Sequence, residues 1–275
     1  MNKSSLILFI IILIAGCGSD KKEITIDTEN KVSIADSLKQ QFLPIIGGSW
    51  VGRNYLALLE ENKSPMKSFE KADGIFSVII PFEAEKDTAW VNIDYNNHEA
   101  DGFTVYFKPG TQKASLATNY KMYDRETDFF ELSYAVTNRD TILFINRFNA
   151  SKKLVKSMAF KRVSRETATD YSGYPVEVAV NKLLFEGEYT YTDSLNQTGK
   201  VVFKDDGTVT GFGKFVKYYV NTDYTVYDPE ELPATDFIYL HKANSDNAGT
   251  IYDYSITGNT LFLWHDDVKY KLIKE

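Results

Sequence analysis

Cysteine is almost absent from this chain: Cys17 is the single cysteine among 275 residues. One thiol cannot form a disulfide within the chain, and it cannot build the thiolate clusters of structural zinc sites. Histidine is scarce as well, with three residues. The sequence therefore excludes a disulfide framework and holds few of the side chains that usually bind transition metals.

An excess of basic residues is also missing. Lysine and arginine total 31 against 38 aspartate and glutamate residues, which is a formal net charge of −7. Proteins that bind nucleic acid normally present a basic face to the phosphates, so this balance argues against a nucleic-acid partner. The hydrophobic content of 43% is, in contrast, high enough for a folded body.

The N-terminal apolar run is too short to span a membrane, since a spanning helix needs about 20 apolar residues. The run covers residues 6–14 and follows a short segment with one positive charge, Lys3. Ala15 and Gly16 come next, and then Cys17. A basic start, a short apolar stretch and small residues at its end are typical of a secretory signal peptide.

The segment Ile14-Ala15-Gly16-Cys17 resembles the lipobox of bacterial lipoproteins. The resemblance implies that residues 1–16 are removed and that the Cys17 thiol receives a diacylglyceryl group. Mature lipoproteins of this type carry three acyl chains, which anchor stably where one chain binds only reversibly. Gly18 stands where some proteobacterial lipoproteins carry an aspartate that retains them in the inner membrane. The resemblance therefore favours the outer membrane, with the periplasmic face preferred over the cell surface.

Residues 17–40 are mostly polar, with isolated aliphatic side chains, and predict a flexible tether. The rest of the chain is dominated by alternation with a period of two, as in Phe103, Val105 and Phe107. Turn signals such as Pro109-Gly110 separate these stretches, which recur about every ten residues. This pattern predicts an all-β protein, either an antiparallel barrel or a sandwich.

Two features suggest that the body is a tandem duplication. Short helical patterns at residues 53–62 and 176–185 each lie near the start of a β-rich region. Gly48-Ser49-Trp50 and Gly187-Glu188-Tyr189 share a Gly-x-aromatic pattern after an apolar pair, 139 residues apart. We therefore expect one unit over residues 41–165 and a second over residues 170–275. A single larger barrel or sandwich made by both halves is the alternative.

A Gly-x-Trp that opens the first strand, followed by about eight antiparallel strands and a terminal basic residue, resembles the lipocalin or calycin group. The resemblance implies that the tryptophan plugs one barrel end and that a basic side chain from the last strand packs over it. The resemblance also extends to small lipocalin-like lipoproteins of Bacteroidetes-type bacteria. The residues that match these closure positions are Gly48, Trp50 and Arg162, with Lys161 as the alternative to Arg162, in the first unit, and Gly187, Tyr189 and Lys271 in the second.

The polar motifs favour structural roles over catalytic ones. Glu83, Glu85 and Asp87 alternate at a strand end, which is typical of a solvated rim. His265-Asp266 lies between two strands and fits a hairpin turn better than a metal site. The serines lack a Gly-x-Ser-x-Gly nucleophile motif. We therefore predict a protein that is not an enzyme and has no cofactor and no bound metal.

One aromatic cluster is a candidate ligand site. Phe215, Tyr218, Tyr219, Tyr224 and Tyr227 lie close together in the sequence and could line the mouth of an apolar pocket. Strand packing combined with a surface flap is the structural alternative for the same residues.

These observations lead to a functional hypothesis of a membrane-anchored protein that holds a small apolar or amphipathic ligand within a barrel. Its role would be lipid handling or sensing in the cell envelope. The alternative is a structural or interaction lipoprotein that binds an envelope protein partner through its outer surface. A hydrolase with unrecognised carboxylates is a third reading. A large empty apolar cavity favours the first hypothesis, whereas a barrel filled by its own side chains favours the second.

Overall fold

The computed structural model describes residues 32–72, 74–95, 99–122, 127–137, 140–167, 173–224, 235–243 and 249–275. The lipidation residue Cys17, the signal segment and most of the predicted tether lie outside the described residues, as does Tyr227. Residues 33–275 form one compact unit. None of the helices in the described ranges is both long enough and apolar enough to cross a membrane.

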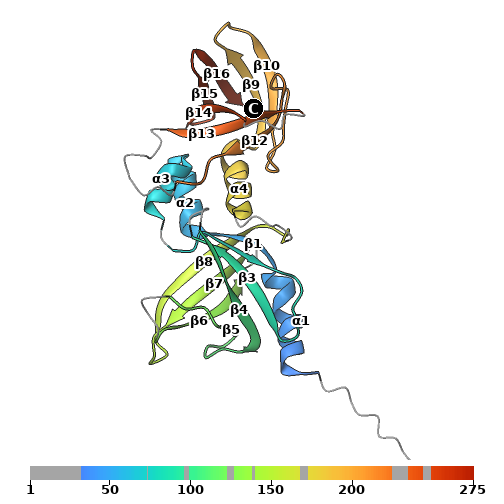
Figure 1. Ribbon diagram of the computed structural model, residues 1–275, viewed down its shortest axis with the longest axis vertical. Helices are drawn as coiled ribbons and strands as arrows, with labels where there is room; N and C mark the ends of the chain where they lie inside the picture. The colour runs from blue at the N-terminus through green and yellow to red at the C-terminus, as the bar shows by residue number, and fades with distance from the viewer. Residues whose placement is uncertain are drawn as a thin grey trace, which may run out of the picture. The chain divides into compact units, whose positions relative to one another are not determined.

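The first half of this unit is a closed eight-stranded antiparallel barrel in which every strand pairs with its neighbour in sequence (Figure 1). The last strand returns to the first, so that Trp50 lies opposite Arg162. Closure removes the exposed strand edges that an open sheet would present. The strands are β1(Gly48–Gly52), β2(Ser77–Ile80), β3(Thr88–Asp94), β4(Ala100–Pro109), β5(Ser115–Thr118), β6(Phe129–Val136), β7(Thr141–Phe148) and β8(Leu154–Ser164).

The second half repeats this topology in an eight-stranded sheet whose two ends nearly meet. A single bridge joins Thr208 to Lys217, and the Tyr218 amide donates to the Gly207 carbonyl at 2.8 Å. The prediction of an all-β fold with two tandem barrels is therefore confirmed. The strands are β9(Gly187–Asp193), β10(Thr198–Phe203), β11(Val209–Thr210), β12(Phe215–Val220), β13(Asp236–Lys242), β14(Thr250–Thr257), β15(Thr260–His265) and β16(Val268–Lys274).

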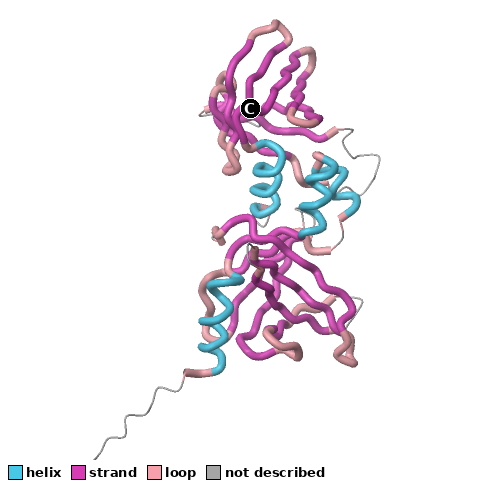
Figure 2. The backbone as a smooth tube through the Cα atoms, turned by 180° about the vertical axis from the view of Figure 1, so that it is seen from behind, coloured by secondary structure: helices cyan, strands magenta, loops and turns pink. Residues whose placement is uncertain are grey.

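The helices are short and lie around the start of each barrel in the chain (Figure 2). Helix α2(Arg53–Asn62) has the predicted bounds, and α4(Tyr174–Val180) continues into a π-helical turn, η1(Asn181–Phe185), as predicted for residues 176–185. Helix α3(Pro65–Lys71) was not predicted. It starts with a Ser64 cap that accepts from the Lys67 amide, and Pro65 occupies the first turn, where a missing N–H costs nothing.

Helix α1(Ile34–Ile46) begins inside the stretch expected to be flexible tether, so an ordered element replaces the last part of that tether. The Ser33 hydroxyl caps the helix by accepting from the Asp36 amide at 3.0 Å. Phe42, Leu43 and Ile46 are buried in the core of the first barrel. The isolated apolar residues looked too sparse to form structure, but at helical spacing they make one buried stripe.

Both barrel interiors are packed with side chains. The first holds a cluster of fully buried aliphatic and aromatic residues around Trp50, Phe103, Phe130 and Phe160. The second cluster continues beyond its barrel, because it includes Tyr55, Leu59 and Phe76 from the first half of the chain alongside residues of α4 and β9–β16. The second cluster therefore joins residues of both halves, whereas the interior of the first barrel forms a separate cluster.

Candidate functional site

The predicted closure residues of the first barrel come together at its start. Trp50 is fully buried, and its indole Nε1 donates to the Ile46 carbonyl at 2.7 Å. The last carbonyls of a helix have no partner within the helix. This one hydrogen bond therefore satisfies both the buried indole N–H and the Ile46 carbonyl. The Arg162 guanidinium lies over the indole ring at 4.5 Å and donates to the Ile45 carbonyl. Burial lowers the pKa of Arg162, and Arg165 nearby lowers it further.

The second barrel uses the same device with different side chains. The buried Tyr189 hydroxyl donates to the Phe185 carbonyl at 2.8 Å, and burial raises the pKa of this tyrosine to about 12. The cation over its ring is Lys274, at 5.8 Å, and not the predicted Lys271. Side chains alternate along a strand, so Lys274 shares the inward side with buried Leu272, whereas Lys271 is exposed on the other side.

Both glycines of the two closure motifs have backbone conformations that side chains disfavour. Gly48 has φ of +125° and Gly187 has φ of +149°. A Cβ atom at Gly48 would lie 2.8 Å from the Ser164 carbonyl oxygen. Glycine is therefore required where the chain turns from helix into strand beneath the aromatic ring.

The aromatic residues predicted to bind a ligand do not converge on a single pocket. Tyr218 and Tyr224 are buried, and their hydroxyls donate to Lys204 and Asn221 carbonyls respectively. Tyr224 also donates to the Asp236 carboxylate at 2.9 Å. Burial raises the pKa of both tyrosines well above the ordinary value. These buried, hydrogen-bonded side chains therefore contribute to the packing of the protein interior.

The two other described members of that cluster lie at partly covered positions. Phe215 packs against Phe212 and Tyr252, with ring centroids 5.9 and 6.1 Å apart. Tyr219 lies beside Tyr239 on the neighbouring strand, 5.9 Å away. Tyr218 and Tyr219 do border a surface hollow of about 490 Å³, together with polar residues that include Glu177 and His241. Strand packing accounts for most of the cluster.

The acidic and histidine motifs lie at the surface. Glu83, Glu85 and Asp87 are exposed, and Asp87 lies 3.6 Å from Lys39. His265 lies 3.5 Å from Asp266 at the hairpin between β15 and β16. Across the described ranges, no three or more His, Cys, Asp or Glu side chains are grouped so that they could hold a metal ion.

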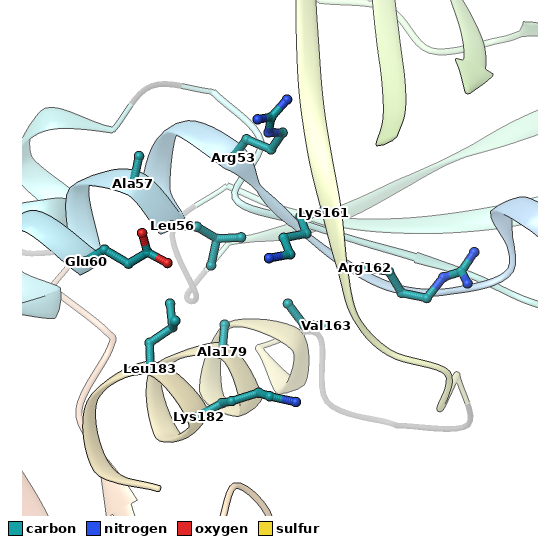
Figure 3. Close-up of a pocket in the computed structure, with 10 residues that line it drawn as sticks. All are labelled: Arg53, Leu56, Ala57, Glu60, Lys161, Arg162, Val163, Ala179, Lys182 and Leu183. Atoms are coloured by element: carbon teal, nitrogen blue, oxygen red, sulfur yellow. The ribbon is translucent and has the colours of Figure 1, made fainter. Parts of the chain in front are cut away.

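A different cavity combines apolar and charged residues. It has a volume of about 400 Å³ and lies between α2, the end of β8, and the α4–η1 segment (Figure 3). Its lining consists of Arg53, Leu56, Ala57, Glu60, Lys161, Arg162, Val163, Ala179, Lys182 and Leu183.

Local sequence explains why these side chains meet. On β8, buried Phe160 faces into the barrel, so Lys161 and Val163 face outward, toward the cavity. On α4–η1, Ala179 and Leu183 are four residues apart and share one helical face. Alanines at positions 57 and 179 fill little space between the packed elements, which leaves the hollow open.

The cavity has an apolar floor and an excess of positive charge. Arg53, Lys161, Arg162 and Lys182 contribute four cations, against the single carboxylate of Glu60. Figure 3 shows the Lys161 and Glu60 side chains extending toward Leu56, whereas the Arg162 guanidinium points away from the centre of the cavity. Such a surface can hold a molecule with an apolar part and a negatively charged part.

Sequence reasoning missed this site because its residues come from three distant segments, 53–60, 161–163 and 179–183. No spacing rule connects them, and each looks ordinary in its own element. The one usable signal was the pair of cationic residues at the end of the last strand of the first unit, Lys161-Arg162, which the sequence indicated only as alternatives for barrel closure.

No protein-family model matches the chain, and no curated protein matches it. Among solved structures, the chain is similar to the crystal structure of a protein with unknown function from the DUF3598 family of Nostoc punctiforme, at 8% sequence identity. The match covers 81% of this chain and 99% of that chain, with a TM-score of 0.19. A similarity at this level carries no argument about function.

Proposed function

We propose that this protein is a non-enzymatic lipoprotein, anchored in the outer membrane through Cys17, that binds a small amphipathic molecule in lipid handling or sensing. The observation that carries the binding proposal is the cavity of about 400 Å³ with an apolar floor and a cationic rim. Its volume falls in the range of about 300–1,000 Å³ that is usual for small-molecule sites.

The binding place differs from the one expected from the sequence. The barrel interiors are filled by buried side chains such as Phe103 and Phe203, so a ligand inside a barrel would have to displace them. The cavity between α2, β8 and α4–η1 needs no such displacement. We therefore place the ligand beside the first barrel.

The anchor rests on the lipobox-like segment that ends at Cys17, which lies outside the described residues. A single cysteine at the end of a signal-like segment, in a chain otherwise free of thiols, supports lipidation at that position. Replacing Cys17 by Ala should move the protein from the membrane fraction to the soluble fraction and abolish labelling with radioactive palmitate. Retention of both in the variant would overturn the anchor.

A second candidate function is recognition of an envelope protein. The outward side of the second barrel carries apolar side chains at diagonally adjacent positions of β15 and β16: Phe262, which is 37% exposed, and Ile273, which is 42% exposed. Exposed apolar groups that lie next to one another often mark interaction surfaces. The packed barrel interiors also agree with this function.

Native mass spectrometry of the full chain, purified gently from its own envelope, separates the two candidates. A bound lipid-like molecule near unit stoichiometry, lost on replacing Leu183 by Gln, would support the ligand-binding function. A ligand-free mass for the parent protein, together with specific crosslinks from β15 and β16 to one envelope protein, would favour the interaction function instead.

A further inference from the structure

We infer that the ligand of this cavity carries an anionic head group on one aliphatic chain, with the head group held by Lys161 and Lys182. The inference deepens the proposed function and rests on it. It follows from the charges of the lining residues, from whether those charges are paired within the described part of the protein, and from the apolar floor of the cavity.

The cations of the cavity come from separate walls. Lys161 projects outward from β8, Lys182 lies on η1, and Arg53 begins α2. Within the described ranges none of these three has an ion-pair partner in the protein. Because Lys161 and Lys182 line the same hollow from different elements, an anion placed between them gains charge-assisted hydrogen bonds from both.

Glu60 sets the orientation of the head group. It is the one carboxylate of the lining and lies on α2, one helical turn from Leu56. A negatively charged head group beside α2 would be repelled by Glu60. Lys161 and Lys182 line the cavity from β8 and η1, and Figure 3 shows Lys182 extending away from Glu60 while Lys161 extends toward Leu56. The head group therefore belongs between β8 and η1.

The floor is suited to an aliphatic chain. Leu56 and Ala179 are 8% and 2% exposed, and Val163 and Leu183 are half-buried beside them. Each methylene moved from water onto such a surface contributes about 0.8 kcal/mol when fully buried. The volume of about 400 Å³ lies near the lower end of the usual range for ligand sites, which favours one chain over two.

The test uses the full chain in native membranes and three photoreactive probes with the same decyl chain. The probes differ only in their heads, which are a carboxylate, a neutral hydroxyl and a quaternary ammonium. Peptide mapping after illumination reports labelling of segments 53–60 and 179–183 over a range of probe concentrations. The variants are Lys161→Gln combined with Lys182→Gln, and Leu183→Gln, with Lys269→Gln, an exposed lysine on β16, as the matched control.

We expect half-maximal labelling of the cavity by the carboxylate probe at a concentration about tenfold lower than for the hydroxyl probe, the factor expected of one charge-assisted hydrogen bond. The double lysine variant should remove this preference without changing the hydroxyl probe. Leu183→Gln should weaken both probes, and Lys269→Gln neither.

The outcomes separate the inference from the function beneath it. Equal labelling by the carboxylate and hydroxyl probes, both dependent on Leu183, overturns the anionic head group and leaves amphiphile binding in place. Preference for the ammonium probe also overturns it, and points to Glu60 as the head-group contact. If no probe labels the two segments at any concentration below membrane disruption, the cavity is not an amphiphile site and both proposals fail.

Discussion

At the scale of single residues, Trp50 and Tyr189 show how different side chains reach the same structural result. The indole N–H of one and the hydroxyl of the other each donate to a carbonyl four residues earlier, at the end of a helix. Each ring also lies under a cation from the last strand of its barrel. The shared requirement is a flat apolar body with one donor, which few side chains meet.

Replacing Trp50 or Tyr189 by Phe removes the donor and leaves a buried carbonyl without its partner. We expect Tyr189→Phe to lower the free energy of unfolding by about 1 kcal/mol, and Trp50→Phe by more, because the smaller ring also leaves a void. Urea unfolding measures both values. Tyr239→Phe, at a half-buried position on β13, is the control and should change little. Equal stability of all three variants and the parent would show that the two hydrogen bonds contribute nothing.

Glu177 gives a pH-dependent prediction. Burial raises its pKa above the ordinary value of 4.5, so the ionised carboxylate is less favourable in the folded state than in the unfolded state. Its contribution to stability is therefore full below pH 4.5 and is lost as the pH rises through the folded-state pKa. We expect Glu177→Gln to be more stable than the parent at about pH 7, with a difference that disappears below the ordinary pKa of glutamate. Urea unfolding across this range measures the effect, and a pH-independent difference would contradict it.

At the scale of elements, the junction between helix and first strand is the feature that both barrels share. Each junction needs a glycine with positive φ, followed two residues later by the aromatic closure residue. The surroundings of the two glycines differ. A Cβ at Gly48 would meet backbone, the Ser164 oxygen, whereas a Cβ at Gly187 would meet the Lys274 side chain at 2.5 Å, near its flexible end.

Gly48→Ala should therefore be more destabilising than Gly187→Ala, because backbone cannot move aside as the end of a lysine side chain can. Both variants carry the cost of a side chain at positive φ, about 1–2 kcal/mol, and only Gly48→Ala adds a steric clash with fixed atoms. Thermal unfolding followed by circular dichroism ranks the two. The reverse order would mean that β8 shifts more easily than this packing implies.

Much of the element structure followed from the sequence, because alternation and capping are local. The strands and the helix over residues 53–62 could be located from hydrophobic period and turn residues alone. Helix α1 was missed because its buried stripe, with Phe42 and Ile46, makes sense only against the barrel that it covers. The prediction of Lys271 as the closing cation was wrong for a related reason, since the inward side of a strand end is set by its pairing partners.

At the scale of the whole molecule, one of the two apolar clusters contains residues from both halves of the chain. Leu59 of α2 is fully buried in the same cluster as Leu184, Phe185 and the interior of the second barrel. Asp236 at the start of β13 accepts from the Met66 amide of α3 at 3.0 Å, which adds a polar link. Neither half can lose its structure without exposing part of this cluster.

Leu59→Ala should therefore destabilise both barrels together, by about 2–5 kcal/mol, the usual cost of truncating a buried leucine. Hydrogen exchange followed by mass spectrometry reports each barrel separately, through peptides from β6–β7 and from β14–β15. We expect protection to fall in both sets of peptides. Leu195→Ala, at a surface residue that is 75% exposed, is the control and should change neither. A loss of protection confined to the second barrel would show that the halves unfold independently.

The sequence by itself determined the features that depend on neighbours in the chain: the antiparallel all-β class, the two tandem units, the helical segments α2 and α4–η1, and the lipobox-like segment at Cys17. Their signals are short-range, since strand alternation, turns and caps are properties of a few consecutive residues. Tertiary structure alone decided that the barrels are filled and that the hollow lies outside them. Filling depends on how side chain volumes from many strands fit together, and the cavity joins α2, β8 and α4–η1 across more than a hundred residues of chain.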